Sequence, residues 1–190
     1  MFSCSKSSVS CDEAQQKFNK LRAKYRTTPF IFTDGSKNDQ HTANGIVCGR
    51  HENLARLDDG TSIFLAELHA IYLALKFIES KKLRHAVICS DSRSVIQSLM
   101  RNSELSPLLI SVLNKHQELC EAGVKIQFLW IPGHSGIKGN ERADQIAKDA
   151  LTFVIVTKLL TDFSSIKSSI RRATYTTGKV SGQTTKHKPN

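Results

Sequence analysis

The sequence contains no apolar run long enough to span a lipid bilayer. The longest such run, residues 151–160 (LTFVIVTKLL), is interrupted by Lys158, whereas a membrane-spanning helix needs roughly 20 apolar residues. The N-terminal residues also lack the apolar stretch of a secretory signal. From the sequence alone, we therefore do not expect a transmembrane protein. We therefore expect an intracellular location, in the cytoplasm or the nucleus.

Closely spaced cysteines are also missing. The five cysteines stand at positions 4, 11, 48, 89 and 120, and no two form a C-x-x-C pair. Neither a disulfide framework nor a zinc site fits an odd, scattered set of this kind. We interpret them as reduced thiols.

The central part of the chain has no net charge, although the 190 residues together carry +10. Residues 1–29 have a net charge of +4 and residues 152–190 a net charge of +6, whereas residues 30–151 hold 14 basic and 14 acidic residues. The basic excess is therefore confined to the ends, either as solvated arms or as nucleic-acid contacts. We predict a basic N-terminal extension (1–28), one folded domain (29–151) and a basic, Ser/Thr-rich C-terminal tail (152–190).

Hydrophobic periodicity predicts a mixed α/β domain. Three early strands suggest an antiparallel meander, and the later alternation of strands and helices suggests parallel additions to the same sheet. The result would be a five-stranded mixed sheet flanked by helices. The expected strands are 30–34, 44–51, 53–58, 86–90 and 124–131, and the expected helices are 12–26, 63–80, 92–100, 105–121 and 138–151.

Two aspartates follow buried strands. Asp34 begins the turn signal Asp-Gly-Ser, and Asp91 comes directly after the strand at 86–90. If these strands are parallel neighbours, the two carboxylates lie side by side at the edge of the sheet where ligands bind in α/β proteins. Taken singly, either residue is better explained as an ordinary turn or cap aspartate, which is common at strand ends.

Two further acids lie on predicted helices. Glu67 falls inside the apolar stripe of its helix, where an unpaired carboxylate is costly; the alternative is an acid that reaches water near the helix N-terminus. Asp144 lies near the start of the last helix, which follows a glycine-rich loop that carries His134. Four gathered carboxylates repel one another unless cations neutralise them. Oxygen ligands suit Mg²⁺, with Mn²⁺ as a substitute, and a pair of such ions indicates phosphodiester hydrolysis.

Four motifs, TDGS (33–36), AELHAIYLAL (66–75), SDS (90–92) and GHSGIKGNERADQIA (133–147), closely resemble the signatures of ribonuclease H domains. The resemblance extends from about residue 30 to residue 151. It implies a ribonuclease H-like fold and a two-metal endonuclease that cuts the RNA strand of RNA–DNA hybrids, leaving 5′-phosphates. It also implies that Asp34, Glu67, Asp91 and Asp144 bind the metals, and that His134 assists proton transfer or product departure.

The resemblance is strongest to the ribonuclease H domains of non-LTR retrotransposon polyproteins. It therefore implies a retroelement origin and a reverse transcriptase or other retroelement machinery as a partner. Ile63-Phe64 and Arg93 replace polar residues of cellular relatives, and no basic handle is evident. We expect a monomer that contacts the hybrid, with the tails adding electrostatic affinity. The expected substrate contacts are Gly35, Ser36, Ser92, Arg93 and Asn140.

Two other functions remain open at this stage. The same fold could serve as a catalytically silent nucleic-acid-binding or interaction domain. It could also belong to a transposase or integrase relative that joins DNA strands, although those proteins usually present fewer acids in a different order. A cleavage assay on hybrid and on duplex nucleic acids would separate the three.

Overall fold

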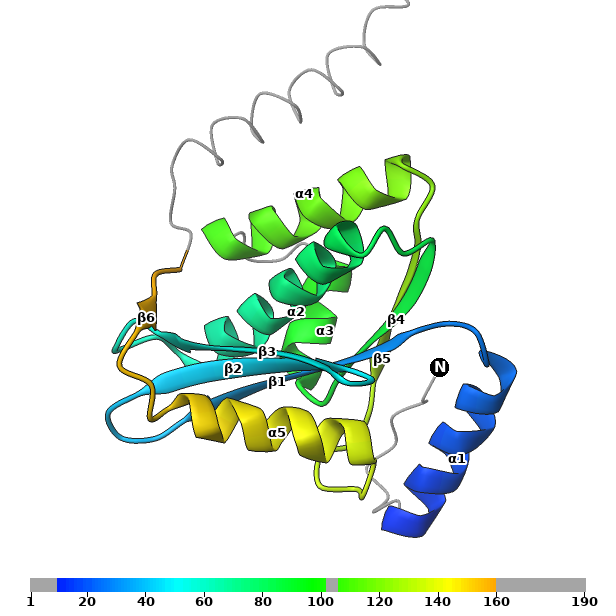
Figure 1. Cartoon of the computed structure of the whole chain (residues 1–190), viewed down its shortest axis with the longest axis horizontal. Coiled ribbons are helices and arrows are strands. Elements are labelled where there is room, and N and C mark those ends of the chain that lie inside the picture. Colours follow the sequence, from blue (N-terminus) through cyan, green and yellow to red (C-terminus); the bar gives the residue numbers. More distant parts are fainter. Residues whose placement is uncertain (1–9, 102–105, 160–190) are drawn as a thin grey trace, which may run out of the picture.

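The computed structural model describes residues 10–101 and 106–159 (Figure 1). Its elements in chain order are α1 (Cys11–Lys24), β1 (Phe30–Lys37), β2 (Thr42–Cys48), β3 (His51–Leu57), α2 (Ile63–Ser80), β4 (His85–Ser90), α3 (Arg93–Arg101), α4 (Pro107–Glu121), β5 (Lys125–Trp130), α5 (Lys138–Ala150) and β6 (Val156–Thr157). Within these described residues, no helix has the length and apolar character that crossing a bilayer requires.

The strands form one mixed sheet in the order β5-β4-β1-β2-β3-β6. β1, β2 and β3 pair as an antiparallel meander, and β4 and β5 add in parallel beside β1. The predicted mixed sheet is therefore confirmed, but it has six strands rather than five. The sixth, β6, pairs with the open edge of β3 through Arg56↔Val156 and Leu57↔Thr157. Two residues are too few to give an alternating pattern, so this strand has no signal in the sequence.

Helices cover both faces of the sheet (Figure 1). α2, α3 and α4 pack on one face, where Ile31, Leu75 and Ile88 belong to the larger apolar core. α1 and α5 lie on the other face, where Phe32, Val87 and Ile146 belong to a second core. The helices thus sandwich the strands that carry the candidate site.

The N-terminal helix is part of this packing. Ser10 caps α1, and Ala14 and Phe18 are its buried residues. Phe18 lies edge-on to Phe30, with ring centroids 5.6 Å apart. Residues 11–24 are therefore not a solvated arm, because one face of the helix buries apolar side chains against the sheet.

Two other segments depart from the sequence prediction. β1 does not end at Asp34 but continues to Lys37, because Gly35, Ser36 and Lys37 pair with β2. Cross-strand pairing overrides the local turn signal, and the chain turns later, where the Asn38 side chain accepts hydrogen bonds from the backbone of residues 40 and 41. In the apolar run at 153–160, the side chains of Val154 and Ile155 are largely exposed, and β6 pairs with the edge of the sheet. Residue 160 lies outside the described residues. The predicted start of the fourth helix, residue 105, also lies outside them.

Candidate active site

The parallel pair β1–β4 places two carboxylates at one edge of the sheet. Its last register pair is Thr33↔Ser90, so Asp34 and Asp91 come next on their strands. The prediction that these two aspartates lie side by side at the ends of neighbouring parallel strands is thereby confirmed. Asp34 continues into pairing with Gly45 of β2, whereas Asp91 leaves the sheet at a bend before α3. The end of the parallel ladder therefore brings the two aspartates together at one edge.

Glu67 reaches the same two aspartates from α2. The helix begins after Ser62, whose side chain accepts a hydrogen bond from the Leu65 backbone N–H. β1 and α2 approach closely here: a Cβ added at Gly35 would lie 2.9 Å from the Glu67 backbone nitrogen. Only glycine permits this approach without displacement, and it brings the carboxylate of Glu67 against the strand.

Asp34, Glu67 and Asp91 form a compact group whose ligand oxygens all lie within 4.8 Å of one another. Burial raises the pKa of Glu67 to about 9, with repulsion from Asp34 and Asp91 adding to the shift. Burial, together with repulsion from the nearby carboxylates of Asp91 and Asp144, raises the pKa of Asp34 to about 8. The Glu67 Oε2 atom is buried and has no hydrogen-bond partner. A divalent cation supplies both the missing partner and the opposing charge, so this donor set fits Mg²⁺ or Mn²⁺.

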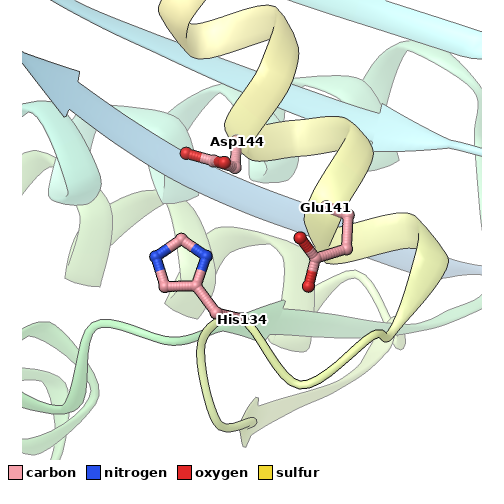
Figure 2. A group of neighbouring side chains, drawn as sticks. All are labelled: His134, Glu141 and Asp144. Carbon is pink, nitrogen blue, oxygen red and sulfur yellow. The ribbon is translucent and has the colours of Figure 1, made fainter.

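Asp144 joins this group indirectly. Its carboxylate lies close enough to Asp34 to raise the pKa of that residue, and its Oδ2 accepts a hydrogen bond from Lys148 Nζ at 2.7 Å. The ligand atoms of Asp144 cluster within 4.8 Å of those of His134 and Glu141. Figure 2 shows Glu141 and Asp144 extending from α5 toward the loop that carries His134. The four predicted carboxylates thus form two adjoining groups that meet at Asp34 and Asp144.

Glu141 is a member of the site that sequence reasoning missed. It lies in the first turn of α5, three residues before Asp144, so both side chains share one side of the helix. Its Oε1 accepts a hydrogen bond from the Gly136 backbone N–H at 3.1 Å. The i,i+3 spacing to Asp144 was the available signal. His134 is exposed and has a positive φ of 49°, a strained conformation for a residue with a side chain.

Three neighbours orient Asp91. Asn140 is buried and donates from Nδ2 to Asp91 Oδ2 at 3.1 Å, and Trp130 Nε1 donates to the Asp91 backbone carbonyl at 3.0 Å. A Cβ on Gly133 would lie 2.8 Å from Asp91 Oδ2, so the His134 loop begins directly against this carboxylate. Asn140 was expected to contact substrate; in the structure its described contact is with Asp91.

A buried polar pair fixes α2 relative to the meander. Asn44 of β2 donates to the Ala66 carbonyl, and its Nδ2 lies 2.7 Å from His69 Nδ1. Burial lowers the pKa of His69 to about 4, so the ring is neutral at pH 7 and Nδ1 can accept this hydrogen bond. The pair anchors the turn of α2 that carries Glu67. Sequence analysis did not identify either residue, because nothing in their spacing relates position 44 to position 69.

The remaining predicted contacts surround the carboxylates. Gly35 and Ser36 continue β1 beyond Asp34 and are half-buried, and Ser92 and Arg93 follow Asp91, with Arg93 exposed. Ser92 Oγ lies 3.3 Å from Ser94 Oγ, and its backbone N–H donates to Ser90 Oγ. These groups lie next to the acidic cluster along the chain and are partly or fully accessible.

Comparison with protein families gives a match that covers most of the chain. The family model described as RNase H matches residues 26–152. The chain belongs to the RNase H family. The sequence resemblance is therefore confirmed at the level of the family, and the likeness to non-LTR retrotransposon domains remains a prediction.

Curated relatives include both viral and cellular members of the RNase H family. The chain is 30% identical over 117 residues to the Pol polyprotein of caprine arthritis encephalitis virus, covering 62% of this chain and 10% of the relative. It is 30% identical over 95 residues to human ribonuclease H1, covering 44% of this chain and 33% of the relative. With ribonuclease H of Nitrosococcus oceani it shares 28% identity over 144 residues, covering 64% and 92% of the two chains. The chain thus spans a minor part of the first two relatives and nearly all of the third.

Solved structures show the same fold. RNase H1 from Halobacterium salinarum aligns with a TM-score of 0.53 and 22% identity, covering 65% of this chain and 97% of that one. LC11-RNase H1, solved in complex with an RNA/DNA hybrid, aligns with the same TM-score and identity and covers 65% and 96%. At this level of identity the comparison establishes the RNase H fold.

Proposed function

We propose that this protein hydrolyses the RNA strand of RNA–DNA hybrids in a reaction that requires divalent metal ions. The observation that carries the proposal is the convergence of Asp34, Glu67 and Asp91 within 4.8 Å, with a buried Glu67 oxygen that lacks a partner. Unneutralised, this arrangement destabilises the fold, so a cation-dependent function explains why the chain maintains it. The presence of an RNA/DNA hybrid in the LC11-RNase H1 structure supports the choice of substrate.

Asp34, Glu67, Asp91 and Asp144 would hold two Mg²⁺ ions, which Mn²⁺ could replace. When bound, such ions activate a water molecule and neutralise charge on the phosphate undergoing displacement. The protein's own contribution is to fix the carboxylates: Asn140 and Trp130 orient Asp91, and the Asn44–His69 pair anchors the helical turn that carries Glu67.

His134 would move a proton at the 3′-oxygen that leaves the scissile phosphate. Its exposed imidazole stands beside Asp144 and Glu141, where it can reach a bound phosphate. Donation of that proton yields a 3′-hydroxyl and leaves a 5′-phosphate on the other product. A general acid of this kind accelerates such reactions by roughly 10²–10⁴-fold.

Gly35, Ser36, Ser92 and Arg93 would contact the hybrid next to the carboxylates. The wide minor groove of an A-like hybrid displays its 2′-hydroxyls, which serine hydroxyls and backbone groups can recognise. Arg93 would bind a phosphate. If the chain derives from a retroelement, the hybrid would be the product of a reverse transcriptase partner.

A cleavage assay tests the proposal. The purified chain is incubated with labelled RNA–DNA hybrid, duplex DNA and duplex RNA, with Mg²⁺ or with EDTA. We expect cleavage of the hybrid alone, only with metal, and a loss of at least 100-fold in Asp91→Asn. The matched control is Asp39→Asn, which makes the same change at an exposed loop residue and should leave the rate unchanged.

Other outcomes would contradict the proposal. Hybrid binding without cleavage in Mg²⁺ or Mn²⁺ would instead assign the chain as a catalytically silent binding domain. Joining of DNA strands would assign it to the transposase or integrase type.

A further inference from the structure

The N-terminal helix lies outside the residues that match the RNase H family, which begin at residue 26. It nevertheless packs into the core behind the candidate site. Phe18 is buried between Phe30 and Phe32, at ring-centroid distances of 5.6 and 5.8 Å. α1 is therefore an addition to the common domain that the fold has fully incorporated.

The same apolar cluster contains both ends of the His134 loop. Ile131, just after β5, and Ile137, just before α5, are buried together with Phe18. Between them, residues 132–136 form the loop, and its only buried side chain belongs to Ser135, whose hydroxyl donates to the Pro132 carbonyl. The position of the loop thus depends on a core to which α1 contributes.

α1 also touches the loop directly. Cys11 Sγ lies 3.6 Å from the His134 carbonyl oxygen, in position to donate a weak hydrogen bond. The Gln15 amide fills the place that a side chain at Gly136 would occupy. Glu141 of α5 accepts a hydrogen bond from the Gly136 backbone N–H. Residues of both α1 and α5 therefore contact the loop at Gly136, two residues after the strained His134.

We infer that α1 is a positioning element for His134: it holds the loop in the conformation that presents the imidazole to Asp144. The inference rests on the proposed function. The proposed metal-binding carboxylates Asp34, Glu67 and Asp91 come from β1, α2 and the end of β4, whereas Gln15 lies against Gly136 of the His134 loop. Loosening α1 should therefore affect turnover through His134 and spare both metal binding and substrate affinity.

The experiment compares Gln15→Ala with the matched control Gln16→Ala, in which the neighbouring exposed glutamine of the same helix changes. The first readout is amide hydrogen exchange in residues 133–137 of the full-length protein without substrate. We expect exchange of the Gly136 amide to accelerate at least threefold in Gln15→Ala and to stay unchanged in Gln16→Ala. Equal exchange in the two variants would overturn the inference, whether or not the protein is a nuclease.

The second readout is a kinetic cycle with His134→Ala on an RNA–DNA hybrid. Gln15→Ala should lower kcat about three- to tenfold with little change in KM, and this effect should vanish when His134 is already alanine. Mn²⁺ affinity, measured by calorimetry, should be unchanged. A similar loss in both backgrounds, or a weakened Mn²⁺ affinity, would show that α1 acts through general stability and would overturn the inference.

Discussion

Glu67 is the residue whose proposed role in metal binding is most costly for the stability of the fold. Its carboxylate is buried beside two other acids and has an oxygen without a hydrogen-bond partner. The Gly35 backbone N–H stabilises the charged form, but burial and repulsion prevail and raise the pKa to about 9. The metal-free protein therefore retains a proton here at neutral pH.

This shift predicts how metal-free stability depends on pH. In the unfolded chain Glu67 and Asp34 titrate near pH ~4, but in the folded protein their pKa values are about 9 and about 8. Between these limits the folded state binds more protons, so the free energy of unfolding falls as pH rises from about 4 to about 9. Glu67→Gln removes one such group and should stabilise the metal-free protein at pH 8 by ~1 kcal/mol or more.

Urea unfolding in EDTA at pH 5, 6, 7 and 8 measures this effect, with the exposed Glu121→Gln as the control. The gain should be smallest at pH 5, because the unfolded chain is then closest to the pH at which it also binds this proton, and folding costs the least in proton uptake. Excess Mg²⁺ should reverse the order, since the wild type then gains a bound ion that the variant holds poorly. A Glu67→Gln protein that is less stable than the wild type throughout the series would contradict the account.

Asn140 offers a second test at this scale. Asn140→Ala removes the amide that donates to Asp91 Oδ2, and leaves that carboxylate free to turn away from the cluster. Loss of such an orienting partner typically weakens metal binding by about 10–100-fold, so we expect Mn²⁺ affinity to fall at least tenfold. Calorimetric titration measures it, and Asn53→Ala at an exposed position of β3 is the control. An unaltered affinity would mean that Asn140 does not orient Asp91.

At the scale of elements, the start of strand β1 could be predicted from the sequence, but its end could not. Its apolar start and the acid that follows were sufficient to predict a buried strand leading to Asp34. The Asp-Gly-Ser signal was misleading about its end, because pairing with β2 depends on residues 42–48, which a local pattern does not include. Helix α2 was easier to predict, since its apolar stripe and the Ser62 cap are local features.

The close approach of β1 and α2 gives a prediction for this scale. Gly35→Ala places a Cβ 2.9 Å from the Glu67 nitrogen and 3.0 Å from its Cγ, so strand and helix must separate. We expect the free energy of unfolding to fall by ~1–3 kcal/mol, and the hybrid cleavage rate to fall further than stability alone explains because Glu67 moves. Urea unfolding and cleavage rates at saturating Mg²⁺ measure the two effects. Full activity in this variant would mean that the contact does not set the position of Glu67.

For the whole molecule, the question is where the positive charge acts. The sequence predicts that the two basic ends add electrostatic affinity for the hybrid, and the simplest test would remove residues 1–28 and 153–190 together. Because α1 is packed into the core, removing residues 1–28 would expose Phe30 and Phe32 and confound charge with folding. The packing of α1 against the sheet could not be predicted from the sequence, because a weakly amphipathic helix does not indicate which surface it will cover.

A shorter truncation removes none of the described core residues. The chain ending at residue 159 loses six basic residues and one acid, all outside the described structure. We expect weaker hybrid binding at low salt and a flatter plot of log K against log [salt], by about 0.7–0.9 for each phosphate that the tail no longer neutralises. Fluorescence anisotropy between roughly 50 and 200 mM salt, where such binding weakens steeply, measures the slope. Superimposable plots for the full and shortened chains would exclude the tail as a contact.

The hairpin between β2 and β3 divides the site in an instructive way. Its turn at Gly49, where φ is +60°, separates the segment that carries Asp34 from the one that carries Glu67, Asp91 and Asp144. A break in the backbone at this turn would yield two fragments, and neither fragment would contain all four of the carboxylates proposed to bind metal. The proposed nuclease activity would then appear only when the two fragments reassemble, so this turn is a suitable place to divide the chain for a split reporter.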